Sequence, residues 1–150
     1  MKYTVRIYED GSFWYKEGTK ILHREDGPAI EYADGSKIWY LNRKRHREDG
    51  PALEWTDGSK EWWLNGKRHR EDGPALEYVD GSKSWYFHGK LHREDGPALE
   101  WAGGRKEWWL NGEELTKEEF NAGKVNTLTI DGKTIELSKE TVDNIKSLLK

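Results

Sequence analysis

The chain has no cysteine and only one methionine among its 150 residues. Without cysteine it can form neither disulfides nor thiolate metal sites, and this composition is compatible with a reducing cytosol. Hydrophobic residues make up only 34% of the chain, and no apolar run is long enough for a signal peptide or a membrane-spanning helix. We therefore expect a soluble, cytoplasmic protein that does not bind membranes.

An excess of positive charge is also absent. The formal net charge is −3, which argues against binding of duplex nucleic acid through neutralised phosphates. Charged residues make up 35%, a balance that would favour disorder if the hydrophobic residues did not include nine Trp and seven Tyr. These large rings can cover a thin sheet that has few aliphatic side chains.

The middle of the chain repeats one motif, His-Arg-Glu-Asp-Gly-Pro-Ala, at a constant interval of 23 residues. The four copies begin at His23, His46, His69 and His92. Repeats of this kind bury their hydrophobic faces on one another and present a long surface instead of one pocket. The interval divides the chain into a degenerate N-terminal repeat or cap (1–22), four hairpin repeats (23–114) and a C-terminal cap (115–150). Such an organisation favours a binding protein over an enzyme.

Each repeat reads as two aromatic-rich strands. Counted from His as position 1, positions 7–11 and 15–19 flank an Asp-Gly-Ser turn, and a second turn falls at positions 20–21. The second turn reads Asn42-Arg43, Asn65-Gly66, His88-Gly89 and Asn111-Gly112, and Asn-Gly suits the positive φ angles of a type I′ hairpin. Gly-Pro at positions 5–6 ends the strand before each Ala. No helical periodicity interrupts this pattern. It predicts an all-β fold, an elongated antiparallel β-meander of stacked 23-residue hairpin repeats with a small α/β C-terminal cap.

A two-residue first turn would set the two faces of this sheet. It places position 8 opposite position 17 and position 10 opposite position 15. In the second repeat the core-forming face would then comprise Leu53, Trp55, Lys60, Trp62 and Leu64. The other face would carry Ala at position 7, Glu at position 9 and the aromatic residue at position 18. A three-residue turn with a bulge would shift this register.

Position 18 supplies a second aromatic column, which the core-facing pattern does not require. Its members are Tyr40, Trp63, Tyr86 and Trp109, and their cross-strand neighbours at position 23 are Arg45, Arg68 and Leu91. The column either packs on the next turn of a curled sheet or under the C-terminal tail, or it stacks on a ligand. Aromatic and Arg residues dominate binding hot spots. The candidate binding residues are therefore these four rings with Arg45 and Arg68, and in addition His46, His69 and His92.

The His-Arg-Glu-Asp block contains residue types that are used in acid–base catalysis. It occurs four times at equivalent positions, whereas a catalytic site is normally assembled once, and no Gly-rich phosphate loop or Asp-Phe-Gly accompanies it. We therefore expect no enzymatic activity. The Arg, Glu and Asp of each copy predict an electrostatic ladder between neighbouring turns, with the Asp side chain folded onto turn amides.

The histidines of the block predict a structural ladder, each lying across the hairpin from a Trp such as Trp39, Trp62 or Trp85. His88 and His92 form the one local pair with metal-ligand spacing, and a zinc site needs further ligands. We therefore expect neither a metal nor a cofactor.

One stretch of the repeats resembles a known family. The Trp-Trp-Leu-Asn-Gly-Lys-Arg-His of 62–69, with the Gly-Pro-Ala of 73–75 and the Tyr-Val-Asp-Gly of 78–81, resembles the MORN-like repeats, whose hairpins share a W-x-x-x-G-K core. The His-Arg-Glu-Asp-Gly-Pro-Ala version is similar to a subtype in uncharacterised proteins of large tailed bacteriophages. The resemblance spans 23–112, with 10–15 as a degenerate leading unit, and departs from ordinary MORN repeats in the His-Arg-Glu-Asp block. It implies an elongated β-sheet used as a scaffold or for binding proteins or lipids. It also implies an association with bacterial antitoxins and with phage proteins that antagonise host defences.

After the fourth repeat the pattern changes. Thr116-Lys117-Glu118-Glu119 is a capping-box sequence that predicts a short helix ending near Gly123. Residues 128–137 alternate around Asp131-Gly132 as a hairpin, and Ser138 is placed to cap a final helix. The apolar stripe of that helix, Val142, Ile145, Leu148 and Leu149, either seals the open end of the sheet or contacts a partner or a second copy.

Three functions fit these observations. The leading hypothesis is a non-catalytic binding module, phage-encoded by resemblance, that blocks or sequesters a host protein. The second is a sponge for a small nucleotide, with bases stacked on Trp and phosphates held by Arg and His; the Glu at position 9, expected on the same face, counts against it. The third is a structural or assembly protein. Four clean repeats with atypical ends favour a monomer or small homo-oligomer over an open polymer.

Overall fold

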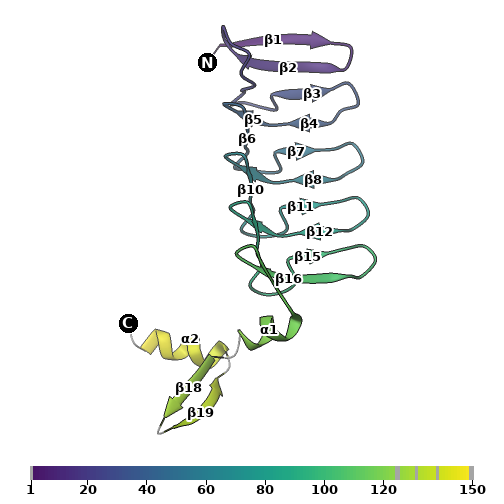
Figure 1. Cartoon of the computed structure of the whole chain (residues 1–150). Coiled ribbons are helices and arrows are strands. Elements are labelled where there is room, and N and C mark those ends of the chain that lie inside the picture. The colour runs from purple at the N-terminus through teal and green to yellow at the C-terminus, as the bar shows by residue number, and fades with distance from the viewer. Residues whose placement is uncertain (1, 124–125, 131, 138, 149–150) are drawn as a thin grey trace.

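The computed structural model describes residues 2–123, 126–130, 132–137 and 139–148. The chain forms an elongated stack of antiparallel hairpins that leads into a small C-terminal part with two helices and one hairpin (Figure 1). Eleven strands belong to one open sheet, in the order β1-β2-β3-β4-β7-β8-β11-β12-β15-β16-β17. The predicted all-β meander of stacked hairpin repeats with a small α/β C-terminal cap is therefore confirmed.

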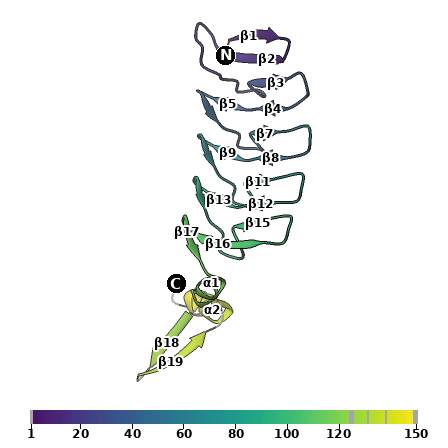
Figure 2. The same cartoon turned by 45° about the vertical axis from the view of Figure 1, so that its right-hand side comes forward.

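Each repeat contributes two hairpins, which run as two rows side by side along the stack (Figures 1 and 2). The strands of the long sheet are β1 (Tyr3–Tyr8), β2 (Gly11–Lys16), β3 (Ile30–Tyr32), β4 (Lys37–Ile38), β7 (Leu53–Glu54), β8 (Lys60–Glu61), β11 (Leu76–Glu77), β12 (Lys83–Ser84), β15 (Leu99–Glu100), β16 (Lys106–Leu110) and β17 (Glu113–Leu115). The second row consists of the side hairpins β5 (Tyr40–Leu41) with β6 (Lys44–Arg45), β9 (Trp63–Leu64) with β10 (Lys67–Arg68), and β13 (Tyr86–Phe87) with β14 (Lys90–Leu91). In the fourth repeat the end of β16 pairs with β17 in the equivalent place.

The first turn of each repeat spans three residues, at positions 11–13. In the second repeat the Trp55 N–H donates to the Ser59 carbonyl at 3.0 Å, and Gly58 lies in the left-handed region at φ +94°, where glycine is strongly favoured. The Asp57 Oδ1 accepts from the Ser59 N–H at 2.7 Å and closes the turn. Leu53 therefore pairs with Glu61, so position 8 faces position 16. The prediction that position 8 faces position 17 was wrong because it assumed a two-residue turn.

This shift of one residue exchanges side chains between the faces of the sheet. Positions 8, 10 and 16 share one face, whereas positions 9 and 15 share the other. The predicted core face is therefore only partly correct: Leu53 is buried, but Trp55 and Lys60 are exposed. The core lies at positions 7 and 8, where the four Ala are fully buried. Its central cluster comprises Ile30, Ile38, Ala52 and Leu53, with Phe13, Leu22, Tyr32, Trp39, Tyr40 and Trp63 packed against it.

Neighbouring repeats are joined by the same hydrogen bonds at every step. The N–H of the Trp at position 17 donates to the Ala carbonyl at position 7 of the next repeat, as Trp62 does to Ala75 at 2.8 Å. The Ser hydroxyl at position 14 accepts from the N–H at position 11 of the next repeat, as Ser59 does from Val79 at 3.0 Å. Repetition of the motif follows from these contacts, since each copy must fit both its neighbours.

The ends of the stack differ from its middle. At the N-terminal end Trp14 takes the place of a position-17 Trp, because its N–H donates to the Ala29 carbonyl at 2.8 Å. At the C-terminal end α1 (Lys117–Ala122) begins at Thr116 with the predicted capping box. This helix packs against β16 and β17 and buries Phe120.

The remaining elements are the hairpin of β18 (Asn126–Ile130) with β19 (Lys133–Leu137) and α2 (Lys139–Leu148). Ile145 and Leu148 of α2 are exposed, so these two members of the predicted stripe do not seal the sheet, and α1 is the helix that packs against β16 and β17. The side chain of Val142 is not among those described. The predicted turn residue Asp131, the predicted cap Ser138 and Leu149 lie outside the described residues. No helix in the described part of the chain is long and apolar enough to cross a membrane.

Candidate functional site

The side chains at positions 10, 16, 18 and 23 of the repeats form one surface, here called the aromatic face. In the second repeat the Trp63 Nε1–H donates to the Glu61 Oε2 at 2.9 Å, and the Arg68 Nη2 lies 3.6 Å from the same oxygen. Position 16 therefore lies beside positions 18 and 23. Because position 10 shares its face with positions 8 and 16, all four columns lie together.

Positions 18 and 23 pair across the side hairpins as predicted. Tyr40 lies opposite Arg45, Trp63 opposite Arg68, and Tyr86 opposite Leu91. The arginines also reach the neighbouring repeat: the Arg45 guanidinium lies 4.9 Å from the centroid of the Trp63 ring, and that of Arg68 lies 5.4 Å from the Tyr86 ring. Cations and rings therefore alternate along the face, an arrangement that favours both partners electrostatically.

The rings of position 18 are half-buried. Tyr40 and Trp63 pack against the core cluster, and the Trp109 Nε1–H donates to Glu107 at 3.2 Å. The first of the two predicted roles, packing on a curled sheet, therefore describes Tyr40 and Trp63 in the free protein. A role of the column in binding stays a prediction.

Sequence reasoning missed the aromatic residues at position 10. Trp55, Tyr78 and Trp101 are 40%, 44% and 37% exposed, one ring in each of three successive repeats. Burial and the neighbouring Glu61 carboxylate raise the pKa of Tyr78, which places this ring near the second repeat's part of the aromatic face. The Asp-Gly-Ser sequence was the available signal, since a three-residue turn moves position 10 out of the predicted core.

An open hollow of about 290 Å³ lies on the surface between the third and fourth repeats. Tyr78, Ser84 and Trp101 are among the residues that line it. Ser84 occupies position 16, where the other repeats have Ile38, Glu61 and Glu107. The hollow thus lies at the repeat in which position 16 has its smallest side chain.

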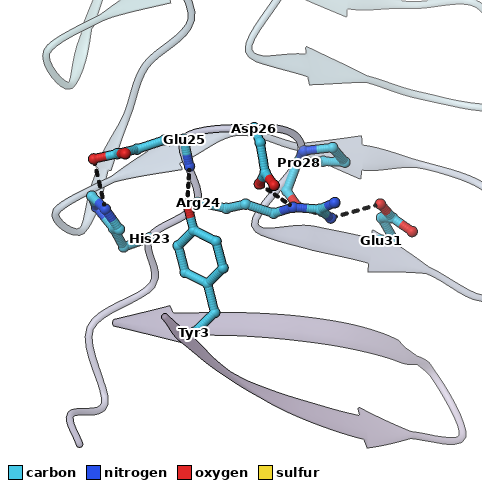
Figure 3. Close-up of polar contacts among 7 residues, drawn as sticks. All are labelled: Tyr3, His23, Arg24, Glu25, Asp26, Pro28 and Glu31. Carbon is cyan, nitrogen blue, oxygen red and sulfur yellow. Dashed lines mark hydrogen bonds and ion pairs between the residues drawn. The ribbon is translucent and has the colours of Figure 1, made fainter. Parts of the chain in front are cut away.

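The His-Arg-Glu-Asp block lies elsewhere and is engaged in structural contacts. Figure 3 shows the first copy, in which the Arg24 guanidinium donates to Asp26 at 3.0 Å and to Glu31 at 3.1 Å. It also donates to the Pro28 carbonyl at 3.1 Å and lies 4.3 Å from the Trp14 ring centroid. The ion pairs thus form within a repeat, and the ring provides the link to the preceding unit, in place of the predicted ladder of charges between turns.

The same network recurs in every repeat. The Arg at position 2 bonds the Asp at position 4, the Pro carbonyl at position 6 and the Glu at position 9, and it covers the preceding Trp. Hydrogen bonds from these arginines are the main cause that lowers the pKa of Asp26, Asp49 and Asp72, and the backbone amide of each Asp contributes as predicted. Glu at position 9 is therefore held on the face opposite the aromatic face.

The block histidines are hydrogen-bond acceptors for the backbone. The Nδ1 of each accepts from the N–H at position 20, at 3.1 Å for His46 and His69 and at 3.0 Å for His92. An accepting Nδ1 requires a neutral ring with its proton on Nε2. The Nε2 lies 3.5 to 3.7 Å from a carboxylate oxygen of the Glu at position 3. As predicted, each lies across from a Trp, because its own N–H donates to a Trp carbonyl at 3.1 to 3.2 Å.

The structure therefore separates the predicted site residues into two groups. The rings of position 18 lie together with Arg45 and Arg68, whereas His69 packs on Phe87 at position 19, on the other side of the side hairpin. His69 also stacks on His88 at 4.4 Å between ring centroids. Within the described ranges no three His, Asp or Glu side chains gather in a way that would hold a metal ion.

No protein-family model, no curated protein and no solved structure matches this chain. The likeness to MORN-like repeats therefore rests on the sequence motif, and function is argued from the geometry of the aromatic face.

Proposed function

We propose that this chain is a non-catalytic binding module that acts in the cytoplasm and holds a partner protein on its aromatic face. The observation that carries the proposal is the row of Trp55, Tyr78 and Trp101, whose rings are 37 to 44% exposed. They stand beside the alternating Arg and aromatic side chains of the side hairpins. Large, exposed aromatic surface is costly to leave in water and marks interaction sites.

The spacing of the rings fits an extended protein surface. Successive rings are separated by two strands of the sheet, which corresponds to about 9.5 Å. Trp, Tyr and Arg are the residues most enriched at hot spots of protein interfaces, and this face supplies all three. Each ring directly follows a strand of the long sheet, β7, β11 or β15, and its backbone is tied to the turn by a hydrogen bond to position 14, as in Trp55 to Ser59 at 3.0 Å. This anchoring limits the conformational entropy that is lost when a partner binds.

Charge along the side hairpins gives the face a direction. Position 23, which belongs to this face, is Arg45, Arg68, Leu91 and Glu114 from the first repeat to the fourth. The row is thus basic over its first repeats and acidic at its end. A partner with acidic groups at one end and basic groups at the other would be guided into a single orientation, because charge complementarity fixes register and raises the association rate.

The residues of acid and base type in the His-Arg-Glu-Asp blocks are all engaged in structural contacts, which supports a non-catalytic role. In each copy the Arg is bonded to the Asp and the Glu of the same repeat, as Arg70 is to Asp72 and Glu77. The block His accepts a hydrogen bond from the backbone, as His69 does, and the described copies make the same contacts. By the resemblance to phage proteins, the partner we propose is a host protein that this module blocks or sequesters, as a counter-defence protein or an antitoxin does.

Affinity capture tests the proposal. The protein, tagged at its C-terminus, is incubated with bacterial lysate beside a variant with Trp55→Ala, Tyr78→Ala and Trp101→Ala. We expect a stoichiometric protein to bind the parent and to be lost from the variant, since each hot-spot ring contributes about 2 kcal/mol, or about 30-fold in affinity. Phe87→Ala is the matched control, because this ring is 39% exposed but lies on the other side of the side hairpin.

Circular dichroism establishes that all variants are folded. Retention of the partner by the triple variant, or its loss from the Phe87→Ala control, would contradict the assignment of the binding surface to the aromatic face.

A sponge for a small nucleotide is the second candidate, and one observation favours it. The Arg68 Nε is buried without a hydrogen-bond partner among the described residues, and its guanidinium lies between the rings of Trp63 and Tyr86. An unpaired donor in this place suits a phosphate, with a base stacked on a ring. The Glu at position 9 lies on the opposite face and no longer opposes it, but the Glu61 carboxylate, 3.6 Å from the Arg68 Nη2, does.

Thermal shift with a panel of nucleotides separates the two functions, because a ligand stabilises the folded state that binds it by about 2.7 kcal/mol at one hundred times its Kd. A shift that disappears in Arg68→Lys would establish the sponge. Unchanged melting with every nucleotide would exclude it.

A further inference from the structure

The two ends of the long sheet are built differently. At the C-terminal end β17 has three residues, two of them exposed glutamates, and α1 packs against it. At the other end β1 has six residues, Tyr-Thr-Val-Arg-Ile-Tyr, and among the described residues it has a neighbouring strand on one side only (Figure 1). Proteins usually protect such an edge with short strands, charges or a covering element, and β1 lacks most of these devices.

The backbone of β1 presents hydrogen-bonding groups outward at every second residue. Trp14 and Lys16 of β2 donate their N–H groups away from β1, to Ala29 and Ile21, at 2.8 and 2.9 Å. Their partners in β1 are Val5 and Tyr3. In an antiparallel ladder both members of such a pair point their amides away from each other. Tyr3 and Val5, and by alternation Ile7, therefore direct their N–H and C=O groups to the open edge.

The side chains of these residues are also suited to a contact. Val5 and Ile7 are 45% and 80% exposed, and pairing with β2 is continuous from Tyr3 to Tyr8 without a bulge or a proline. Exposed apolar side chains on a regular edge strand are the usual signal for addition of another strand.

We propose that β1 pairs antiparallel with β1 of a second copy of this chain, so that the two long sheets join into one. The two-fold axis passes beside Val5, which faces Val5 of the second copy, and Tyr3 faces Ile7. All three residues have outward amides, so this register forms six backbone hydrogen bonds. The partner is a second copy because the strand is complementary to itself in this register.

The charged residues of β1 favour the register centred on Val5 over the registers centred on Arg6 or Thr4. With Val5 at the axis, Arg6 lies opposite Thr4 and Lys2 opposite Tyr8, so no like charges meet. A shift that centres the pairing on Arg6 places the two arginines opposite each other, and a shift that centres it on Thr4 places Lys2 opposite Arg6. Like charges directly opposite one another destabilise a strand pair, so both alternatives are disfavoured.

The joined sheet keeps corresponding faces on the same side, because the axis that relates antiparallel neighbours is perpendicular to the sheet. The aromatic faces of the two copies would therefore form one surface of double length. This consequence rests on the proposed function, and it gives a partner with two equivalent segments a large gain through avidity. The dimer itself does not depend on any partner.

The mass of the purified protein in solution tests the dimer. Light scattering after size exclusion, at about 100 μM and with any tag at the C-terminus, is expected to give twice the 17.6 kDa of the chain. Val5→Lys and Val5→Glu each place two like charges at the axis and are expected to halve the mass. Val79→Lys is the matched control, since Val79 is 67% exposed in a turn far along the chain, and it is expected to remain dimeric.

Mixing the two Val5 variants provides the sharper test. The substituted side chains then carry opposite charges across the axis, and the dimer mass is expected to return in the mixture. A monomeric parent protein, a dimer that persists in both single variants, or a mixture that stays monomeric would each overturn the proposal. Ile7→Lys is a second substitution in the paired part of β1. Circular dichroism of every variant shows whether the protein is folded, so that loss of the dimer mass is not mistaken for unfolding. None of these readouts involves the aromatic face, so they succeed or fail independently of the proposed function.

Discussion

Replacement of Arg70 tests whether the recurring block of each repeat exists to hold the stack together. The Arg70 guanidinium donates to the Pro74 carbonyl at 3.2 Å and to Glu77 at 2.8 Å. It also lies 3.9 Å from the centroid of the Trp62 ring in the preceding repeat. One side chain therefore joins a turn, a strand and a neighbouring unit.

The magnitude follows from these contacts. The bond to the carbonyl contributes about 1 kcal/mol, the partly exposed ion pair with Glu77 about 0.5 to 1 kcal/mol, and the stack on Trp62 about 0.5 to 1 kcal/mol. Arg70→Ala is therefore expected to cost about 2 to 3 kcal/mol. For a chain of this length that corresponds to a fall of about 5 to 10 °C in Tm.

Thermal unfolding followed by circular dichroism and by Trp fluorescence measures the effect. Arg70→Lys is the matched control, since it retains the charge and loses the planar fork, and we expect about half the loss. A Tm within about 2 °C of the parent for Arg70→Ala, or full stability of the Lys variant, would refute the reasoning that the guanidinium joins the repeats.

Two further predictions concern the same block, and a third concerns the turn. A Cβ at Gly73 would lie 3.0 Å from the Arg70 Cζ, so Gly73→Ala is expected to displace the guanidinium, and its loss of Tm combined with Arg70→Ala should be smaller than the sum of the two single losses. Burial and the neighbouring His88 lower the pKa of His69, so the folded state favours the neutral ring; this stability is present above the unfolded pKa of about 6.5 and is lost as the pH falls below it. His69→Asn keeps an acceptor and cannot titrate, and urea unfolding at a series of pH values should show a weaker acid dependence than in the parent. Gly81 lies at φ +89°, and a methyl group on its Cα would meet no atom within 4 Å, so Gly81→Ala is expected to cost about 1 to 2 kcal/mol through backbone strain alone, additively with Arg70→Ala.

Much of the fold follows from the 23-residue interval and from the turn residues. The stacked hairpins, the pairing of Trp63 with Arg68 and the capping box at Thr116 were all predicted from short sequence patterns. These features are local, since each depends on a few adjacent residues with one preferred conformation.

The division of the two faces was not predictable from the same information. It depends on whether Asp57-Gly58 fills a turn of two residues or belongs to a turn of three, and both turns accept Asp-Gly. The hydrogen bond from Ser59 to Asp57 and the register of the next repeat decide between them. One residue of difference moved Trp55 from the expected core to the surface, and with it the centre of the candidate site.

The sequence predicted that the His-Arg-Glu-Asp block has a structural role, but it did not predict which residues the Arg contacts. Sequence reasoning treated Arg70 as part of a surface charge ladder, whereas its inter-repeat contact is with the ring of Trp62. The arrangement depends on the close approach of the guanidinium to Gly73, which no sequence pattern in a single repeat reveals. Pro74, Glu77 and Trp62, which Arg70 contacts, lie four, seven and eight residues from it, on both sides in sequence, and the fold brings them together.

Hydroxyl-radical footprinting of the captured complex tests the central claim most directly, because it reports which rings the partner covers. We expect oxidation of Trp55, Tyr78 and Trp101 to fall when the partner is bound, while Phe87, which is similarly exposed on the other side of the side hairpin, is oxidised as in the free protein. Equal oxidation of the three rings with and without the partner, or protection of Phe87 in their place, would contradict binding through the aromatic face.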